Sequence, residues 1–354
     1  MNDAALNAMR ILYFTRPMEQ TFLDVLEKDG GFTTERRHLT DPEETIFQAL
    51  SETHVYSISS AKDELPKQFW GVDSLFERCP NILMLSTYGA GYDVCDLEAA
   101  TRAGVAVVNQ AGGNKEGVAE HALAMMLDIA KKLTLADRAV RRGGITDRDI
   151  FKGVELKDKT VGIIGIGHVG GRLAELCKGL FNCEVVAYDP LLTAAQIAAK
   201  GARKVDSLQE LAAASDFVSL NCPLIPTTRG MVDASVFEAM KDGAIYVATA
   251  RGYIHDEDAL VAALNSGKLA GAGIDVWDIE PPPTDHPLLQ MENVVLSPHT
   301  AGITYESRRN IAKIAAEQLV EVRNGKRPPR LLNPEVWPQF QKRFEAVFGM
   351  RPED

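Results

Sequence analysis

Residues 161–171 read VGIIGIGHVGG, and three glycines in this stretch take the spacing Gly165-x-Gly167-x-x-Gly170. The apolar run before the glycines predicts a β-strand, and the residues after them predict an α-helix. In such a turn the first glycine permits the tight bend, the second lets backbone N–H groups approach a phosphate, and the third lets the helix pack closely on the strand. The helix N-terminus then attracts a pyrophosphate. The stretch therefore predicts a dinucleotide-binding Rossmann domain, the alternative being a glycine-rich turn that binds nothing.

An acidic residue in the expected place supports this interpretation. Asp189 lies 19 residues after Gly170, at the end of the next predicted strand. A carboxylate there can bind both ribose hydroxyls and repels a 2′-phosphate, and no arginine follows directly, so NAD is favoured over NADP. The predicted cofactor contacts are Gly165, Gly167, His168, Val169, Gly170, Asp189, Cys222, Thr249, Ala250 and Asp275.

Short β-rich runs alternate with helical patterns on both sides of this turn. Before it, strands are expected at Arg10–Phe14, Phe32–His38, His54–Ser59, Asn81–Thr87 and Val105–Asn109. From it onward, they are expected at Thr160–Gly165, Cys183–Tyr188, Phe217–Asn221, Ala244–Thr249, Gly271–Ile274 and Val294–Ser297. This alternation predicts parallel strands joined by crossover helices, and hence two doubly wound α/β domains.

The late position of the glycine turn implies that one domain is inserted into the other. Residues 1–113 form the first part of a flavodoxin-like substrate domain, and residues 114–300 form the Rossmann NAD-binding domain. The chain then returns to the substrate domain over residues 301–354. One long helix is expected over residues 115–142, and because its centre is apolar nearly all round, it should be buried between domains or subunits. The proline-rich segment 326–340 is expected to pack as an extended surface strap.

Composition limits the class of protein. The 354 residues are 45% hydrophobic with a net charge of −11, which suits a large core and disfavours binding to nucleic acid or anionic membranes. No apolar run approaches the roughly 20 residues needed to cross a bilayer, and the N-terminus does not resemble a signal peptide. The five cysteines are scattered without a C-x-x-C pair, which indicates reduced thiols in a cytoplasmic protein without a metal site.

Charged side chains follow three of the later predicted strands. Arg251 comes after AIYVATA, Asp275 after GAGI, and His299 after NVVLSP, while Glu280 lies in the loop after Asp275. Ligands of such sheets bind outside the carboxyl ends of the strands, so these four residues should gather beside the nicotinamide. Taken singly, each is more often a surface cation or a loop residue, and their joint occurrence carries the inference.

Their chemistry suits hydride transfer to a 2-keto acid. The guanidinium of Arg251 can bind a carboxylate and polarise a carbonyl. His299 can serve as the proton donor near the carbonyl oxygen. Glu280 can orient the imidazole by accepting a hydrogen bond from its other ring nitrogen. Asp275 could contact the nicotinamide carboxamide.

Four blocks of sequence carry a specific resemblance. They are SDFVSLNCPLIPTTRGMV (215–232), MKDGAIYVATARGYIHDEDAL (240–260), GAGIDVWDIEPPPTDHPLL (271–289) and ENVVLSPHTAGIT (292–304). They resemble the D-isomer-specific 2-hydroxyacid dehydrogenases, which include phosphoglycerate, glyoxylate/hydroxypyruvate, D-lactate and formate dehydrogenases. The resemblance covers about residues 80–330. It implies an NAD-dependent oxidoreductase acting on a small D-2-hydroxy or 2-keto acid, with Arg251, Glu280 and His299 as catalytic residues. It also implies the nested fold and a homodimer built around the helix at 115–142.

The same resemblance places substrate contacts in the first domain. The loop STYGAGYD (86–93) is expected to offer backbone amides to the substrate carboxylate through Tyr88, Gly89 and Ala90. Asn114 resembles an asparagine beside the substrate, and Lys62 lies in a loop that reaches toward the substrate in relatives. The alternatives are an ordinary glycine turn, a helix N-cap and a surface lysine.

Departures from the family bear on the substrate and on rival functions. SISSAK (57–62) lacks the arginine of the phosphoglycerate enzymes, and Ala248 replaces an asparagine of many relatives. A formate-type enzyme would carry glutamine in place of Glu280. A non-catalytic NAD-sensing corepressor of the same fold stays the main alternative. Of the other histidines, His121 is expected at a helix interface, and His255 and His286 are interpreted as loop residues.

Overall fold

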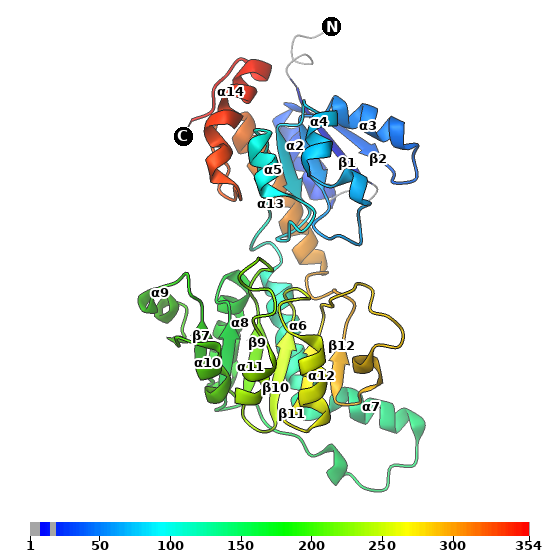
Figure 1. Ribbon diagram of the computed structural model, residues 1–354, viewed down its shortest axis with the longest axis vertical. Helices are drawn as coiled ribbons and strands as arrows, with labels where there is room; N and C mark the ends of the chain where they lie inside the picture. Colours follow the sequence, from blue (N-terminus) through cyan, green and yellow to red (C-terminus); the bar gives the residue numbers. More distant parts are fainter. Residues whose placement is uncertain (1–7, 15–18, 354) are drawn as a thin grey trace. The chain divides into compact units, whose positions relative to one another are not determined.

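The computed structural model describes residues 8–14 and 19–353. Contacts divide the chain into two compact units. The first unit combines the residues up to Asn114 with those from Thr304 onward, and the second is the continuous segment Lys115–Ile303. Each unit contains one parallel sheet with helices around it (Figure 1). The predicted class, two doubly wound α/β domains with one nested in the other, is confirmed.

The sheet of the first unit has five parallel strands in the order β2-β1-β3-β4-β5. The strands are β1 (Met9–Phe14), β2 (Phe32–Arg37), β3 (Val55–Ile58), β4 (Met84–Thr87) and β5 (Ala106–Val108). The helical elements are α2 (Gln20–Asp29), α3 (Glu43–Ser51), η1 (Lys67–Phe69), α4 (Asp73–Arg78), α5 (Leu97–Arg102), α13 (Tyr305–Arg323), η4 (Pro334–Val336) and α14 (Trp337–Phe348). The strand order is that of flavodoxin-like folds, as predicted.

The two faces of this sheet are covered by different parts of the chain. One core cluster combines β-strand residues with α3, α4 and α5. The other combines Met9 and Ile11 of β1 with residues of α2, α13 and α14. Because α13 and α14 are encoded after residue 304, the first unit is complete only when the chain has returned from the second.

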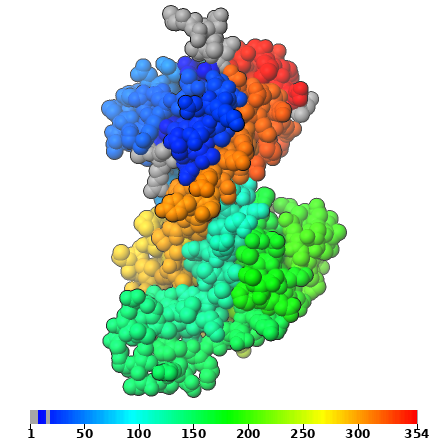
Figure 2. All heavy atoms as spheres, turned by 180° about the vertical axis from the view of Figure 1, so that it is seen from behind, coloured from blue at the N-terminus to red at the C-terminus, as the bar shows by residue number. Residues whose placement is uncertain are grey.

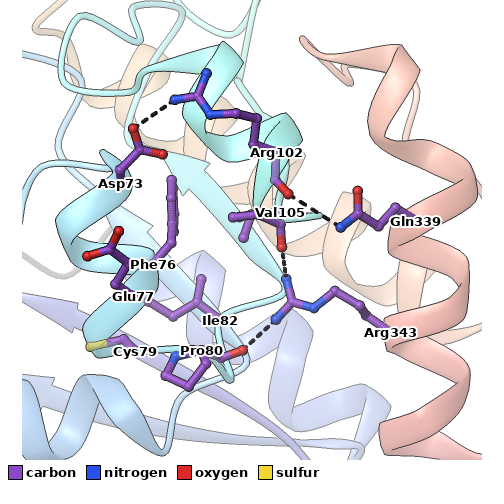
Figure 3. A pocket seen from close by; sticks show the side chains of 11 residues that line it. Asp73, Phe76, Glu77, Cys79, Pro80, Ile82, Arg102, Val105, Gln339 and Arg343 are labelled. Atoms are coloured by element: carbon purple, nitrogen blue, oxygen red, sulfur yellow. Dashed lines mark hydrogen bonds and ion pairs between the residues drawn. The ribbon is translucent and has the colours of Figure 1, made fainter.

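An extended strap was expected over residues 326–340; residues 326–333 are not helical, but the chain from Pro334 onward forms η4 and α14. Trp337, Phe340 and Phe344 recur at helical spacing on α14, and all three are buried. Arg343 on the same helix donates to Pro80 O at 2.5 Å and to Ala103 O at 2.8 Å (Figure 3). The prolines that suggested a strap lie before the helix or in its first turn, where proline is tolerated.

The sheet of the second unit has seven parallel strands in the order β12-β11-β10-β9-β6-β7-β8, the Rossmann order with an added edge strand. The strands are β6 (Thr160–Ile164), β7 (Glu184–Tyr188), β8 (Arg203–Lys204), β9 (Phe217–Leu220), β10 (Ala244–Ala248), β11 (Leu269–Ile274) and β12 (Val294–Leu296). The helical elements are α6 (Lys115–Lys131), α7 (Leu133–Arg142), η2 (Asp149–Phe151), α8 (His168–Phe181), α9 (Ala194–Ala199), α10 (Leu208–Ala214), α11 (Ala234–Ala239), α12 (Glu257–Asn265) and η3 (Pro287–Gln290).

The single helix predicted over residues 115–142 is two helices. Lys132 adopts a left-handed conformation with φ of 52° and separates α6 from α7. The Asp128 carboxylate accepts hydrogen bonds from Thr134 N at 2.7 Å and Thr134 Oγ1 at 2.5 Å, which fixes the break. The apolar centre of the predicted helix belongs to α6, which is buried in the second unit. By contrast, α7 contains no buried residue, and the segment that follows it is exposed at the surface (Figure 2).

Within the described residues, 8–14 and 19–353, no helix has the length and apolar character needed to cross a bilayer. Across the same residues, no group of three or more His, Cys, Asp or Glu side chains is arranged to hold a metal ion.

Candidate active site

The glycine turn joins β6 to α8 as predicted, and its glycines differ in what surrounds them. Gly165 has φ of 83°, and a Cβ on it would lie 2.8 Å from Cys222 Cβ. A Cβ on Gly170 would lie 2.2 Å from Gly165 O. Both glycines are therefore required by the close packing of the turn itself. Gly167 is exposed, and a Cβ there would meet nothing within 4 Å. The fold leaves space above Gly167, where a ligand can approach the backbone.

Asp189 is tied to this turn. It follows β7, and its Oδ2 accepts a hydrogen bond from Ile166 N at 3.2 Å while its Oδ1 accepts one from Leu191 N at 3.1 Å. The first turn of α8 contains no acidic residue. The space at Gly167, the helix N-terminus and a carboxylate at the end of β7 together fit a dinucleotide, with Asp189 near its ribose.

The remaining predicted cofactor contacts lie at the ends of strands or beside the turn. Burial raises the pKa of the Cys222 thiol to about 12, so this side chain stays a neutral thiol. Thr249 is buried directly after β10, and among the described residues none hydrogen-bonds its hydroxyl. A buried hydroxyl without a partner is unfavourable unless a ligand or water supplies one. Thr249 therefore also fits a polar ligand at this edge.

Strands β10, β11 and β12 are adjacent, and each ends near one of the predicted catalytic or nicotinamide-binding residues (Figure 1). His299 Nδ1 lies 2.8 Å from Glu280 Oε2, and the other carboxylate oxygen of Glu280 accepts a hydrogen bond from Trp277 N at 3.1 Å. The two side chains are 30% and 20% exposed, so the pair is held firmly yet is open to a ligand. Arg251 is half-buried, and its Nη1 donates to Ala250 O at 2.7 Å.

Asp275 holds the turn that carries His299. Its side chain is fully buried, and its carboxylate accepts hydrogen bonds from Thr300 N at 2.8 Å, Ala301 N at 3.0 Å and Ser297 Oγ at 2.6 Å. His299 N donates to Asp275 O at 2.7 Å, and His299 adopts a left-handed backbone with φ of 53°. The hydrogen bonds of the Asp275 carboxylate are thus made within the protein. Its predicted contact with the nicotinamide carboxamide stays a prediction.

Two histidines outside the predicted catalytic residues have specific environments. His121, on α6, places Nε2 2.9 Å from Ser297 Oγ and 3.8 Å from Asp275 Oδ1, and so supports the same turn. His255, interpreted as a loop residue, is 1% exposed, and burial lowers its pKa to about 4. Its ring packs edge-on against Tyr246, with centroids 5.6 Å apart. The sequence offered one signal for His121, its place beside the apolar run 122–127 of α6.

The predicted substrate loop of the first unit has its carbonyls engaged within that unit. Gly89 O accepts hydrogen bonds from Thr87 Oγ1 at 2.8 Å and Gln110 N at 2.9 Å, and Ala90 O accepts one from Asn109 Nδ2 at 2.7 Å. The Tyr88 hydroxyl accepts one from Phe14 N at 3.3 Å, and burial raises the pKa of this phenol. The side chain of Tyr88 is therefore part of the core, and only the backbone of the loop suits a ligand.

The other two predicted substrate contacts are less constrained. Lys62 is exposed, with Nζ 5.7 Å from the centroid of the Trp70 ring. Asn114 is half-buried and immediately precedes α6. Neither position excludes the predicted role, and neither side chain is brought to the His299–Glu280 pair by a described contact.

Comparison with known proteins gives the class. A family model of the D-isomer specific 2-hydroxyacid dehydrogenases, describing their NAD binding domain, matches residues 123–301. The D-3-phosphoglycerate dehydrogenase of Archaeoglobus fulgidus is 42% identical over 251 residues, covering 71% of this chain and 47% of that protein. The glyoxylate reductase of Korarchaeum cryptofilum is 38% identical over 265 residues, covering 74% and 79%.

A solved structure agrees. The D-lactate dehydrogenase of Aquifex aeolicus, crystallised with NAD and lactic acid, superposes with a TM-score of 0.75 at 27% identity, covering 89% of this chain and 96% of that one. The chain belongs to the D-isomer specific 2-hydroxyacid dehydrogenase family, and its second unit contains that family's NAD-binding domain. The aligned segment spans about half the length of the phosphoglycerate dehydrogenase that it matches.

Proposed function

We propose that the protein is an NAD-dependent oxidoreductase that transfers a hydride between nicotinamide and C2 of a small D-2-hydroxy acid or its 2-keto counterpart. The observation that carries this proposal is the 2.8 Å contact between His299 and Glu280 beside the carboxyl ends of β10, β11 and β12. It joins a group that can transfer a proton to a carboxylate that orients it, at the edge where ligands of such sheets bind.

The contact between His299 and Glu280 assigns different roles to the two ring nitrogens of His299. Because Glu280 accepts a hydrogen bond from His299 Nδ1, that nitrogen carries a proton and the opposite nitrogen, Nε2, is the one that exchanges a proton with substrate. In reduction His299 would donate this proton to the carbonyl oxygen, and in oxidation it would accept one from the hydroxyl. Arg251 would bind the carboxylate and polarise the carbonyl. Bound NADH supplies the hydride.

The first unit would complete the substrate contacts. In the loop containing Tyr88, Gly89 and Ala90, Tyr88 N already donates to Ile58 O at 3.0 Å, so the backbone N–H groups of Gly89 and Ala90 would bind the substrate carboxylate. Asn114 and Lys62 are proposed to line the same substrate. A smaller 2-keto acid is favoured over phosphohydroxypyruvate, because SISSAK (57–62) lacks an arginine for the phosphate.

We also propose that the protein acts in the cytoplasm as a homodimer that uses the segment from α6 to η2. Several large apolar side chains of this segment are exposed within the second unit, namely Leu133, Val140, Ile145 and Ile150, and Val154 follows closely after it. A surface of this kind commonly lies at an interface between subunits. Light scattering coupled to gel filtration would measure the mass, and a monomer at micromolar concentration would contradict the proposal.

The activity is tested with a panel of 2-keto acids and NADH, followed by the loss of NADH absorbance. Glyoxylate, hydroxypyruvate, pyruvate and phosphohydroxypyruvate represent the substrates of the family. Reduction of at least one at a turnover of about 1 per second or more would support the proposal. Tight binding of NADH without reduction of any of them would favour the NAD-sensing alternative.

A further inference from the structure

A second polar network lies beside the candidate catalytic residues. It consists of Glu257, the first residue of α12, Asp278 in the loop that leads to Glu280, and His286 at the start of η3. All three side chains line a surface groove of about 480 Å³ in the second unit. None of them belongs to the pair described above.

The network joins two loops through backbone groups. The carboxylate of Asp278 accepts a hydrogen bond from Tyr253 N, two residues after Arg251. Asp278 N in turn donates to Glu257 Oε1 at 2.9 Å. Glu257 Oε2 lies 3.1 Å from His286 Nε2, and these two side chains are only 15% and 14% exposed. The loop after β10 is therefore bonded to the loop after β11, and helix α12 is bonded to the second of them.

The hydrogen bonds of His286 define its tautomer. His286 Nδ1 accepts a hydrogen bond from Leu288 N at 3.3 Å, so the ring proton resides on Nε2 and is donated to Glu257. The same ring packs edge-on against Trp277, with centroids 5.5 Å apart. His286 therefore fixes the Glu257 carboxylate in the orientation that accepts from Asp278 N.

Backbone packing reinforces this junction. A Cβ on Gly252 would lie 2.0 Å from Trp277 O, so only glycine allows the segment after Arg251 to press directly on the segment before Glu280. Trp277 N is the donor that binds Glu280 Oε1. The two loops are thus in contact at Trp277 and at Asp278, within three residues of both Arg251 and Glu280.

We propose that Asp278 and Glu257 are positioning residues that set the placement of Arg251 relative to the Glu280–His299 pair. The inference rests on the proposed function, since it assigns a purpose to the arrangement of those three residues. Asp278 acts through Tyr253 N and Glu257 acts through Asp278 N, so each holds a backbone that carries a candidate catalytic side chain. A displacement of about 1 Å in such a group can cost about a hundredfold in rate.

The carboxylate of Asp278 is held at an energetic cost. Burial raises its pKa to about 6, although the hydrogen bond from Tyr253 N opposes this shift. A neutral side chain that keeps one acceptor oxygen would satisfy the same N–H group. The positioning of the two loops therefore depends on the hydrogen bonds of the network and not on the negative charge of its carboxylates. A general electrostatic effect of acidic side chains on the site would depend on that charge.

The variants that test this are Asp278→Ala and Glu257→Ala, and the conservative comparison is Asp278→Asn, which keeps an acceptor oxygen for Tyr253 N. Asp258→Ala is the matched control, because Asp258 is an exposed carboxylate of the same helix turn that lines the same groove. In full-length protein we expect kcat to fall by about tenfold to a hundredfold in both alanine variants. KM for the keto acid should rise and the pH profile of kcat should shift. The Asp278→Asn and Asp258→Ala variants should stay within about threefold of the wild type.

A second measurement does not need turnover. In protein labelled with ¹³C-histidine, the signals of His299 are assigned by their loss in His299→Asn. We expect these signals to move in both alanine variants and to stay in place in Asp258→Ala. Unchanged His299 signals and an unchanged pH profile in both alanine variants would overturn the inference. A wild-type protein that reduces no keto acid would instead refute the proposed function. In that case the His299 signals would still show whether Asp278 and Glu257 position the catalytic residues. If Asp278→Ala does not fold, Glu257→Ala tests the same junction from its other end.

Discussion

His299 and Glu280 are held in one orientation by contacts at both carboxylate oxygens of Glu280. One oxygen lies 2.8 Å from His299 Nδ1, and the other accepts the backbone N–H of Trp277 at 3.1 Å. The backbone of His299 is fixed as well, because His299 N donates to Asp275 O. Neither side chain can therefore turn without breaking a hydrogen bond of the other, which leaves Nε2 of the imidazole as the group that faces a ligand.

Replacing His299 with Asn should remove most turnover and leave NADH binding intact. Asparagine cannot donate and accept a proton in the relevant pH range, so kcat should fall by about a hundredfold to ten-thousandfold. Steady-state kinetics measure the loss and fluorescence titration measures NADH affinity. His38→Asn, at an exposed histidine of the first unit, is the control and should keep full activity. Unchanged turnover in His299→Asn would refute the acid–base role.

Replacing Asp189 with Ala should shift cofactor preference toward NADPH. The carboxylate at the end of β7 would repel a 2′-phosphate, and its removal eliminates that repulsion. NADH binding should weaken at the same time, because the hydrogen bond from Ile166 N to Asp189 is lost. The measurement is the ratio of kcat/KM for NADPH to that for NADH, which we expect to rise by about tenfold or more. A wild-type protein that already prefers NADPH would contradict the cofactor assignment.

The space above Gly167 offers a test that separates folding from binding. A Cβ there meets no protein atom within 4 Å, so Gly167→Ala should fold with a small change in Tm. The added methyl group should nevertheless weaken NADH binding by about tenfold or more, because the phosphate approaches the backbone at this glycine. Gly179→Ala is the matched control, since Gly179 also lies on α8 with nothing within 4 Å of its Cβ. Equal NADH affinity in the two variants would place the phosphates elsewhere.

The first unit should lose stability in mild acid through His54. Burial and the nearby charge of Arg10 lower the pKa of His54 to about 4, from 6.5 in the unfolded chain. As pH falls from about 6.5 to about 4 the unfolded chain binds a proton that the folded protein does not, so the stability that is present above pH 6.5 is lost over this window. His54→Asn keeps an acceptor for Arg10 N, which now donates to His54 Nδ1 at 3.1 Å. Its Tm should fall less than that of the wild type between about pH 7 and about pH 5. An equal fall in both proteins would exclude His54 as a source of the pH dependence.

The fold class and the NAD-binding turn could be predicted from sequence because both depend on local signals. The glycine spacing, Asp189 and the alternation of strands with helices are each visible within a short window. The strands follow the predicted ones closely, except that the two-residue β8 was not predicted. The break at Lys132 was missed because it depends on the Asp128 side chain bonding Thr134, which no hydrophobic pattern reports. The α14 helix was missed because prolines dominate the sequence before it.

The contacts around the candidate site could not be predicted in the same way. His121 and Ser297 are 176 positions apart, and Glu257 and His286 are 29 apart, so only the folded sheet brings them together. The sequence could place Asp275 at a strand end. It could not show that the Asp275 carboxylate accepts hydrogen bonds from backbone N–H groups of the turn that carries His299. The role of His299 in turnover is a prediction that His299→Asn tests, and the roles of Arg251 and Glu280 are predictions of the same kind.

The nested connectivity has a consequence for synthesis on the ribosome. Residues of α13 and α14 share one core cluster with Met9 and Ile11 of β1, although some 300 residues separate them in the chain. The continuous second unit can bury its own sheet as soon as it emerges, whereas one face of the N-terminal sheet is covered only by α2 until α13 and α14 have been made. Nascent chains stopped before α13 should therefore contain a folded nucleotide-binding unit attached to an apolar, chaperone-binding N-terminal half.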